Sequence, residues 1–317
     1  MSSPALTVIL ATDRFDTIRG VVERLRRQTA SRSIELIILT PAREAVDQRE
    51  LEGLAAVRVL EVESVERFAP ARAAGVRAAS APVVVIGETH TYPHPGWAEA
   101  LIAAHRQPWA VVAPGFGNAN PRSALSWAIF LLDYGRWLAG LPACEIDLAP
   151  IHNGAFKRDV LLELGPRLEA GLSHGDELIL HFRARGHRGW FEPSARIDHL
   201  NVTRLPSWLH ERYLGGRLIG AQRAARWGWG RRVLYTAAFP LIPAVVLSRL
   251  WPGVRLARRE GRLPWGTTAA ILVGAAVAAL GEAAGYLRGP RRRAELMMNE
   301  YELHKVRYAR PAPAEGV

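Results

Sequence analysis

Glu88 and His90 stand one residue apart, shortly after the apolar run Val83–Ile86. The run predicts a buried strand, and ligands of an open parallel sheet bind beyond the carboxyl ends of its strands. A carboxylate and an imidazole at that position could hold a divalent cation against a phosphate group. A polar loop that faces water between a strand and a helix is the alternative, and the residue types alone leave both interpretations open.

The elements that would position this pair alternate between strand and helix patterns over the first 200 residues. Strands are predicted at Leu6–Ala11, 34–39, 57–62 and Val83–Ile86, and helices at 17–28 and 67–79. This β-α-β order favours an α/β fold with a doubly wound, mainly parallel sheet and helices on both faces. The sequence contains no GxGxxG and no GxxxxGK(S/T) motif, so the usual dinucleotide and P-loop folds are not supported.

Length and composition limit the class of protein. The chain has 317 residues, 49% of them hydrophobic, which is enough for two domains or for one large domain with an appendage. Cys144 is the only cysteine, so an internal disulfide and a thiolate metal site are excluded. A single cysteine fits a reducing cytosolic environment, and the first residues lack the basic and apolar regions of a signal peptide.

The net charge of +11 is concentrated in the last third of the chain. Residues 201–317 contain 19 basic and 7 acidic residues, whereas residues 1–200 contain 22 and 23. A basic region could bind nucleic acid or an anionic membrane surface. Two apolar segments, 233–250 and 267–287, lie among these arginines, with tryptophans near their ends. Because a membrane helix needs about 20 apolar residues, we expect a membrane partner and no nucleic acid.

The topology of the two apolar segments is open. If both cross a membrane, the loop between them carries four arginines to the far side, against the tendency of positive loops to remain cytoplasmic. The first segment could instead lie in the interface or re-enter, and the second could be a buried core helix. The expected organisation is a domain at 1–200, an amphipathic basic connector at 201–232, two membrane-associated apolar segments at 233–288 and a basic, partly disordered tail at 289–317.

Several motifs follow one another in order along residues 6–200. The first strand leads into Thr12-Asp13-Arg14, an Ala/Arg/Gly-rich helix is expected at 71–79, and Glu88-Thr89-His90 precedes Pro95-Gly96-Trp97. Farther on stand Asn153-Gly154-Ala155-Phe156, then Gly175-Asp176-Glu177, and a last strand that ends in His199. In this order the chain resembles the inverting family 2 glycosyltransferases. Glu88-Thr89-His90 falls at their Asp-x-Asp motif and is similar to the Asp-x-His variant of the mucin-type transferases.

The resemblance implies a GT-A fold, which is Rossmann-like, and a divalent cation, Mn²⁺ or Mg²⁺, that neutralises the leaving nucleoside diphosphate. His90 would be a direct ligand, Glu88 a ligand or a ribose contact, and His199 a further ligand from the last strand. A hydrogen-bonded histidine that ends a strand is the alternative for His199. The resemblance also implies donor contacts from Thr12, Asp13, Thr40, Arg72 and Glu88.

Inversion needs a general base that takes the proton of the acceptor hydroxyl. The resemblance points to Glu177, with Asp176 in reserve, because the family order is Glu-Asp and this chain has Asp-Glu. The same residues could also cap the N-terminus of a helix and interact with its dipole. Thr40 stands where the family usually has an aspartate that reads uracil, so a nucleotide other than UDP, or a site without catalysis, has to be considered.

The same resemblance assigns Asn153, Gly154 and Trp190 to the acceptor side. The expected function is transfer of a sugar, a hexose or a related unit, from a nucleotide diphosphate-sugar to a lipid-linked or glycan acceptor with inversion. We expect the chain at the cell (inner) membrane with a cytoplasmic catalytic domain, and a homo-oligomer is among the partners considered. The alternative is a catalytically silent, membrane-anchored binding or assembly protein on the same fold.

Overall fold

The computed structural model describes residues 3–43, 46, 48–147, 149–174, 176–289 and 292–309. The chain forms two compact units: the first comprises residues 1–117 and 139–198, and the second comprises residues 118–138 and 199–317. The predicted domain boundary at residue 200 lies next to the change of unit after Asp198. Residues 118–138, which are predicted to be part of the first domain, belong to the second unit.

The first unit is built on a sheet whose strands run in the order β3-β2-β1-β4-β8-β6-β9-β5, with β7 paired to β9. Its parallel half consists of β1 (Leu6–Ala11), β2 (Ile34–Thr40), β3 (Ala56–Glu61) and β4 (Val83–Ile86). All residues of β1, β2 and β4 are buried, because helices cover both faces of the parallel sheet and leave no polar side. These four strands match the predicted ones to within one residue.

The other half of the sheet contains β5 (Thr91–Pro93), β6 (Val111–Asn118), β7 (Cys144–Ile146), β8 (Ala155–Lys157) and β9 (Gly189–His199). β8 is antiparallel to both β4 and β6, and β7 is antiparallel to β9. The loop that precedes β8 therefore lies at the edge where β4 ends. This reversal of β8 brings residues from the middle of the chain to Glu88.

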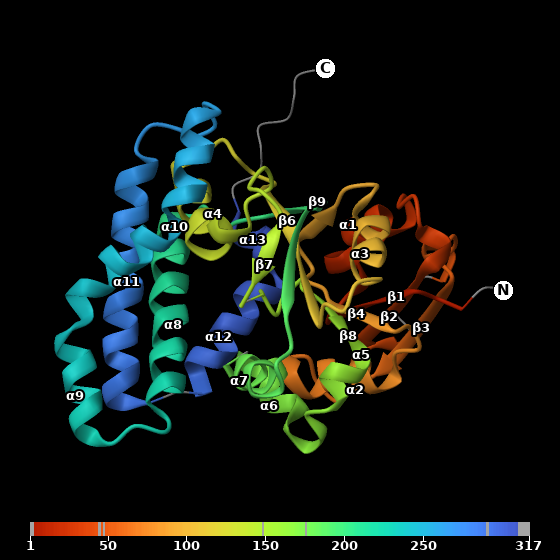
Figure 1. Cartoon of the computed structure of the whole chain (residues 1–317), viewed down its shortest axis with the longest axis horizontal. Helices are drawn as coiled ribbons and strands as arrows, with labels where there is room; N and C mark the ends of the chain where they lie inside the picture. Colours follow the sequence, from red (N-terminus) through yellow and green to blue (C-terminus); the bar gives the residue numbers. More distant parts are fainter. Residues whose placement is uncertain are drawn as a thin grey trace. The chain divides into compact units, whose positions relative to one another are not determined.

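Helices cover both faces of this sheet. Figure 1 shows α1 (Phe15–Arg26) and α3 (Trp97–Ala104) on one face, and α2 (Phe68–Ala78) and α5 (Arg158–Leu162) on the other. α6 (Leu168–His174) and α7 (Asp176–Arg185) follow α5. On α1, Ile18, Val21, Val22 and Leu25 are buried at the spacing of one helical face.

The second unit is helical. It contains α4 (Ala124–Tyr134), α8 (Leu205–Ala224), α9 (Trp229–Ala237), α10 (Ile242–Arg259), α11 (Thr267–Arg288), α12 (Arg292–Leu303) and α13 (Lys305–Tyr308). The segment 289–317, expected as a basic tail, thus includes two helices, and Tyr301 and Leu303 of α12 are buried. Their burial explains why this stretch folds despite its charge.

α8 and α11 lie side by side and approach each other at glycines (Figure 1). A Cβ added to Gly216 or Gly220 of α8 would lie 2.0 Å or 2.2 Å from a backbone oxygen of α11. In return, a Cβ on Gly281 or Gly285 of α11 would lie 2.2 Å or 2.3 Å from a backbone oxygen of α8. Both helices thus carry a G-x-x-x-G pair that lets the two backbones touch.

One helix of the described chain, α11, is long and apolar enough to cross a membrane. The chain has a second possible span only if α9 and the following segment Phe239–Arg259 together form one membrane crossing. These two segments are bent by 49° at the break between them. Pro240 and Pro243 lie just after this break and lack the amide hydrogen that a continuous helix would need. Half of the most apolar window of α11 is buried, so a core helix remains the alternative.

Candidate active site

Glu88 and His90 occupy the loop that follows β4. β4 ends at Ile86, and the Gly87 amide donates to the Ile9 carbonyl of neighbouring β1. Glu88 is buried and His90 is fully buried, with its Nε2 3.8 Å from Glu88 Oε2. The alternative of a water-facing polar loop is therefore wrong for this pair.

Asn153 and Thr91 hold the Glu88 side chain in place. The Asn153 Nδ2 group donates to Glu88 Oε2 at 2.6 Å, and the Thr91 hydroxyl donates to Asn153 Oδ1 at 2.9 Å. The oxygen of the Asn153 amide is fixed by Thr91, so its nitrogen must point at the carboxylate. Both residues are buried, and the hydrogen bond to a charged acceptor is correspondingly strong.

Local backbone geometry explains why Asn153 reaches Glu88. Asn153 has a φ of 63°, which asparagine tolerates better than most residues, and its amide donates to the Ile86 carbonyl at 2.7 Å. At Gly154, an added Cβ would lie 2.3 Å from the Pro150 carbonyl oxygen, so a glycine is required there. The Asn-Gly pair thus ties the loop before β8 to the end of β4.

His152 and Arg72 extend the network to the other carboxylate oxygen. His152 Nδ1 lies 3.4 Å from Glu88 Oε1, and the Arg72 guanidinium lies 3.2 Å from the same His152 nitrogen. Arg72 comes from α2, is buried, and stacks over the Phe68 ring at 4.6 Å. His152 is not among the residues predicted from the sequence. Its position immediately before the Asn-Gly pair is the only signal that could have indicated it.

This arrangement suits a divalent cation. For a cation about 2.1 Å from each of two ligand atoms, those atoms lie roughly 3 to 4 Å apart, and Glu88 Oε2 and His90 Nε2 are 3.8 Å apart. Glu88 supplies a negative charge, and its orientation is set by Asn153 rather than left to the solvent. The Glu88–His90 pair is therefore a candidate metal site.

Three predicted donor contacts lie at the carboxyl ends of β1 and β2. The Thr12 hydroxyl donates to the Arg14 carbonyl at 2.6 Å, and the Thr40 hydroxyl accepts from the Ala42 amide at 3.2 Å. Asp13 lies 3.6 Å from the Arg14 guanidinium. Both hydroxyls thus shape the turns that follow their strands, on the same edge of the sheet as Glu88.

Trp190 lies on the opposite side of the sheet from Glu88, where the parallel strands begin rather than end. It stacks on Trp109 with ring centroids 5.1 Å apart. Trp109 is next to Ala110, whose carbonyl accepts a hydrogen bond from the Lys157 amide. Lys157 in turn pairs with Val83, the first residue of β4. The structure therefore brings Glu88, His90, Arg72 and Asn153 together but leaves Trp190 apart from them.

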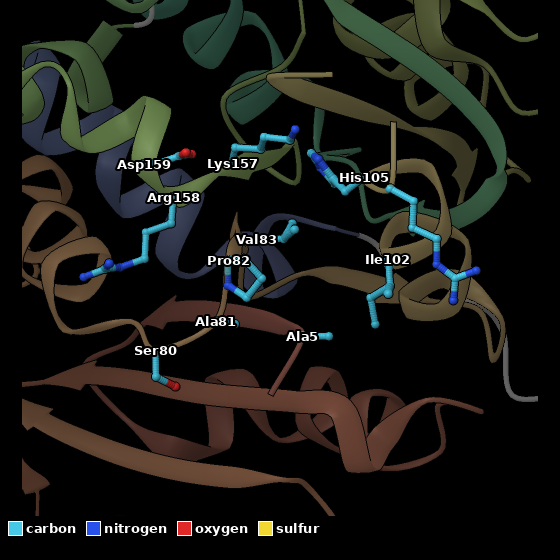
Figure 2. A pocket seen from close by; sticks show the side chains of 11 residues that line it. Ala5, Ser80, Ala81, Pro82, Val83, Ile102, His105, Lys157, Arg158 and Asp159 are labelled. Atoms are coloured by element: carbon cyan, nitrogen blue, oxygen red, sulfur yellow. The ribbon is translucent and has the colours of Figure 1, made fainter. Parts of the chain in front are cut away.

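A pocket of about 610 Å³ also opens at this other edge, where β1 and β4 begin (Figure 2). Figure 2 shows the Lys157 side chain extending towards the His105 ring. Burial, with a contribution from the Lys157 charge, lowers the pKa of His105 to about 4. The His105 ring is therefore neutral at physiological pH, and its Nε2 contacts the Ala155 carbonyl oxygen of β8.

The first unit ends at Asp198, so His199, the next residue, belongs to the second unit. It is buried, its Nδ1 lies 2.9 Å from Asn201 Oδ1, and Asn201 Nδ2 donates to Asn118 Oδ1 at 3.0 Å. Because an amide oxygen only accepts, His199 Nδ1 carries a hydrogen in this contact. Nε2 is then the ring nitrogen that could bind a metal.

Asp176 and Glu177 begin α7, so the helix N-terminus expected there is confirmed. Their side chains lie outside the part of the chain that the structure describes. The roles of Glu177 as the base and Asp176 as its reserve stay predictions, as do the donor, acceptor and metal assignments of the individual residues.

Comparisons with known proteins identify the class. The model of glycosyl transferase family 2 matches residues 7–164. Among solved structures, the mannosyltransferase PcManGT from Pyrobaculum calidifontis, in complex with GDP-Man and Mn²⁺, is similar with a TM-score of 0.50 and 17% identity. The match covers 96% of this chain and 88% of the other. No curated protein matches the sequence.

The chain belongs to glycosyltransferase family 2. Its mixed, mostly parallel sheet with helices on both faces is a GT-A fold, which confirms the predicted fold class. It is a glycosyl-transferring enzyme, and Glu88 lies in the part of the chain that the family model covers.

Proposed function

We propose that this protein is a membrane-attached glycosyltransferase that takes a sugar from a nucleoside diphosphate-sugar and inverts the anomeric carbon. The observation that carries the proposal is the buried Glu88–His90 pair, oriented by Asn153 at the end of β4. A buried carboxylate needs compensating partners, and a bound cation next to His90 would supply the strongest of them.

Glu88 and His90 would hold a divalent cation, Mn²⁺ in the first instance, because imidazole suits Mn²⁺ better than Mg²⁺. When bound, the cation would act as a Lewis acid on the diphosphate. His199 is proposed as a further ligand, supported by the contact of its Nδ1 with Asn201, which leaves Nε2 to bind a metal. Arg72 would add positive charge near the phosphates through its position beside His152.

Transfer with inversion breaks the bond between the anomeric carbon and the phosphate oxygen and forms one to the acceptor oxygen. The acceptor proton must go to a base, for which we propose Glu177, with Asp176 in reserve. Both residues are placed at the start of α7. Their carboxylates would be favoured there by the positive end of the helix dipole.

GDP-mannose is the first donor to test. The similar solved mannosyltransferase binds GDP-Man. In this chain the Thr40 hydroxyl, which already accepts the Ala42 amide, stands where the family usually has an aspartate that accepts the single ring N–H of uracil. This position therefore gives UDP no specific support, and the donor of the similar enzyme is tested before it.

Membrane attachment is proposed for the second unit, with a lipid-linked or glycan acceptor. Its support is a set of exposed large apolar side chains on and between α9, α10 and α11: Trp229, Val233, Leu234, Tyr235, Leu241, Val245, Trp251, Trp265, Leu272, Val273, Leu280 and Leu287. Such a concentration is unusual on a surface that faces only water. Arginines interspersed among them would favour anionic lipid headgroups.

The proposal is tested by titrating purified protein with GDP-mannose and with UDP-sugars, each with Mn²⁺ or with a chelator, and by measuring heat of binding and donor turnover. Metal-dependent binding of one donor with slow hydrolysis supports the enzyme. Metal-dependent binding without any turnover, even with lipid acceptors, would favour a silent binding protein. Equal affinity with metal and with chelator would remove the Glu88–His90 site from the mechanism.

A further inference from the structure

A second cluster of potential metal ligands lies in the first unit, separate from Glu88. Glu163, His181 and His187 converge so that the Nε2 atoms of both histidines contact the same carboxylate oxygen, Glu163 Oε2. The two distances are 3.2 Å for His181 and 3.0 Å for His187. All three ligand atoms lie within 4.8 Å of one another.

The end of α7 explains why the two histidines meet. Gly186 has a φ of 68°, its amide donates to the Arg183 carbonyl, and the His187 amide donates to the Phe182 carbonyl. These two bonds form a Schellman motif, which turns the chain back over the last helical turn. In this motif the second residue after the helix commonly contacts a residue in the last turns, and here that contact joins His187 to His181.

Glu163 completes the cluster from another element. It is the C-cap residue that follows α5, and hydrogen bonds, mainly from His187 and also from His181, lower the pKa of its carboxyl group. Glu163 is therefore ionised at physiological pH. Its side chain is 32% exposed and that of His187 is 22% exposed, whereas that of His181 is only 4% exposed. The cluster thus has one buried ligand, two accessible ones and an open side towards solvent.

We propose that Glu163, His181 and His187 form a second divalent-cation site, of the zinc class. In a tetrahedral site with bonds of about 2.0 Å, two ligand atoms lie about 3.3 Å apart, which is close to the separations of Glu163 Oε2 from the two imidazole nitrogens. Two imidazoles and one carboxylate suit Zn²⁺ and disfavour Mg²⁺. The fourth position would go to water from the open side.

A cation there would connect two elements of the fold. Glu163 is the C-cap residue of α5, His181 lies in α7, and His187 lies between α7 and β9. The cation would therefore fix the C-terminal end of α7, the helix that begins with Asp176 and Glu177. The site is independent of the proposed transfer reaction, because none of its residues belongs to the Glu88 network.

The test uses the full chain with the substitution His90→Ala, which weakens the other candidate site. After metal removal with a chelator, the protein is titrated with Zn²⁺ by calorimetry, and with Co²⁺ by visible absorption. We expect one Zn²⁺ bound per chain and a tetrahedral Co²⁺ spectrum. Adding His187→Gln, which keeps a polar group beside Glu163, should lower the Zn²⁺ affinity by more than the roughly 10–100-fold typical of losing an outer partner.

Two further variants make the result specific. Glu163→Gln alters an accessible side chain and removes only the charge, so it should also abolish tight Zn²⁺ binding while the far-ultraviolet circular dichroism stays unchanged. His94→Gln is the matched control, because His94 pairs with the single carboxylate of Asp198 at 3.0 Å and should leave Zn²⁺ affinity intact. The proposal is overturned if the His90→Ala chain binds no Zn²⁺, or if adding His187→Gln or Glu163→Gln leaves the Zn²⁺ affinity equal to that of the His90→Ala chain.

Discussion

The Asn153 side-chain amide donates a 2.6 Å hydrogen bond to Glu88 Oε2, and these two residues are 65 positions apart in the chain. The contact exists because β8 runs antiparallel to β4, which brings the loop before β8 to the end of β4. A residue expected on the acceptor side is therefore the one that orients the acidic member of the candidate metal site. Its effect on the cation can be measured separately from its effect on folding.

Replacement of Asn153 by glycine and by alanine should separate these two effects. Both variants lose the hydrogen bond to Glu88, so Mn²⁺-dependent nucleotide affinity should fall about 10–100-fold in each. Both residues must adopt the positive φ of 63°, but only for alanine does the Cβ make this conformation unfavourable, by about 1–2 kcal/mol. Calorimetry and urea denaturation of both variants provide the test. Unchanged nucleotide affinity in both would mean that the Asn153 bond serves folding alone.

His90→Ala should weaken Mn²⁺-dependent donor binding, by about 10–100-fold or more if His90 is a direct ligand. His199→Ala should act in the same direction if His199 is a further ligand. His94→Ala is the control, since His94 pairs with Asp198 and lies outside the Glu88 network. Donor affinity is measured with Mn²⁺ and with chelator, and a loss that persists in chelator would point to misfolding rather than to the metal.

Glu177→Gln should reduce turnover by about 10²–10⁴-fold and leave donor affinity nearly intact, because the amide cannot accept the acceptor proton. Asp176→Asn should cost little turnover and at most about 1 kcal/mol of stability through the start of α7. Steady-state transfer rates and donor titrations distinguish the two variants. A reversed ranking would assign the base to Asp176, and parental rates in both would refute this base assignment.

His105 predicts acid sensitivity of the first unit. The unfolded chain binds a proton at the ordinary pKa of 6.5, whereas folding lowers the pKa of His105 to about 4. The free energy of unfolding should therefore decrease as the pH falls from about 6.5 to 4, by about 3 kcal/mol from this group.

The measurement compares urea denaturation at pH 7 and at pH 4.5 in the parent and in His105→Gln. The glutamine retains a donor for the Ala155 carbonyl, which His105 Nε2 contacts at 3.1 Å, but it does not titrate. The difference between the two pH values should be smaller in the variant by about 2–3 kcal/mol. An identical difference in both proteins would show that other groups cause the acid sensitivity.

Membrane attachment can be tested without shortening the chain, which would separate residues 118–138 from the rest of their unit. Leu234→Glu and Leu241→Glu together place two charges where the parent exposes 65% and 66% of each leucine. We expect the parent to sediment with membranes and resist a high-salt wash, and the double variant to be released in part. Leu180→Glu, at 53% exposure on α7, is the matched control. A parent that stays soluble without detergent would identify α11 as a core helix.

Sequence patterns were sufficient for the parallel half of the sheet. Short apolar runs rich in β-branched residues, such as Val83–Ile86, favour buried strands, and the spacing of Ile18, Val21, Val22 and Leu25 specifies one face of α1. The position of Glu88 follows directly from the end of such a strand. Such patterns can be read from the sequence because they depend only on residues that are close together in the chain.

Long-range contacts were not predictable in the same way. β8 has three residues, and no periodicity in so short a run indicates that it reverses direction beside β4. The partnership of Asn153 and His152 with Glu88 depends on that reversal, so the motif indicated the residues but not what they contact. The helices α12 and α13 were hidden by a high density of charge, although tyrosine and leucine side chains bury one side of α12.

The glycines of α8 and α11 let two backbones touch, so attraction between these helices comes from close atomic contact more than from the release of water. Such an interface is about as favourable among lipid tails as in an aqueous surrounding. The ion pair between Arg223 and Glu282, 2.7 Å apart, would gain strength as the dielectric falls. This helix pair is therefore suited to assemble in either solvent, and a transfer from water to a bilayer need not undo its packing.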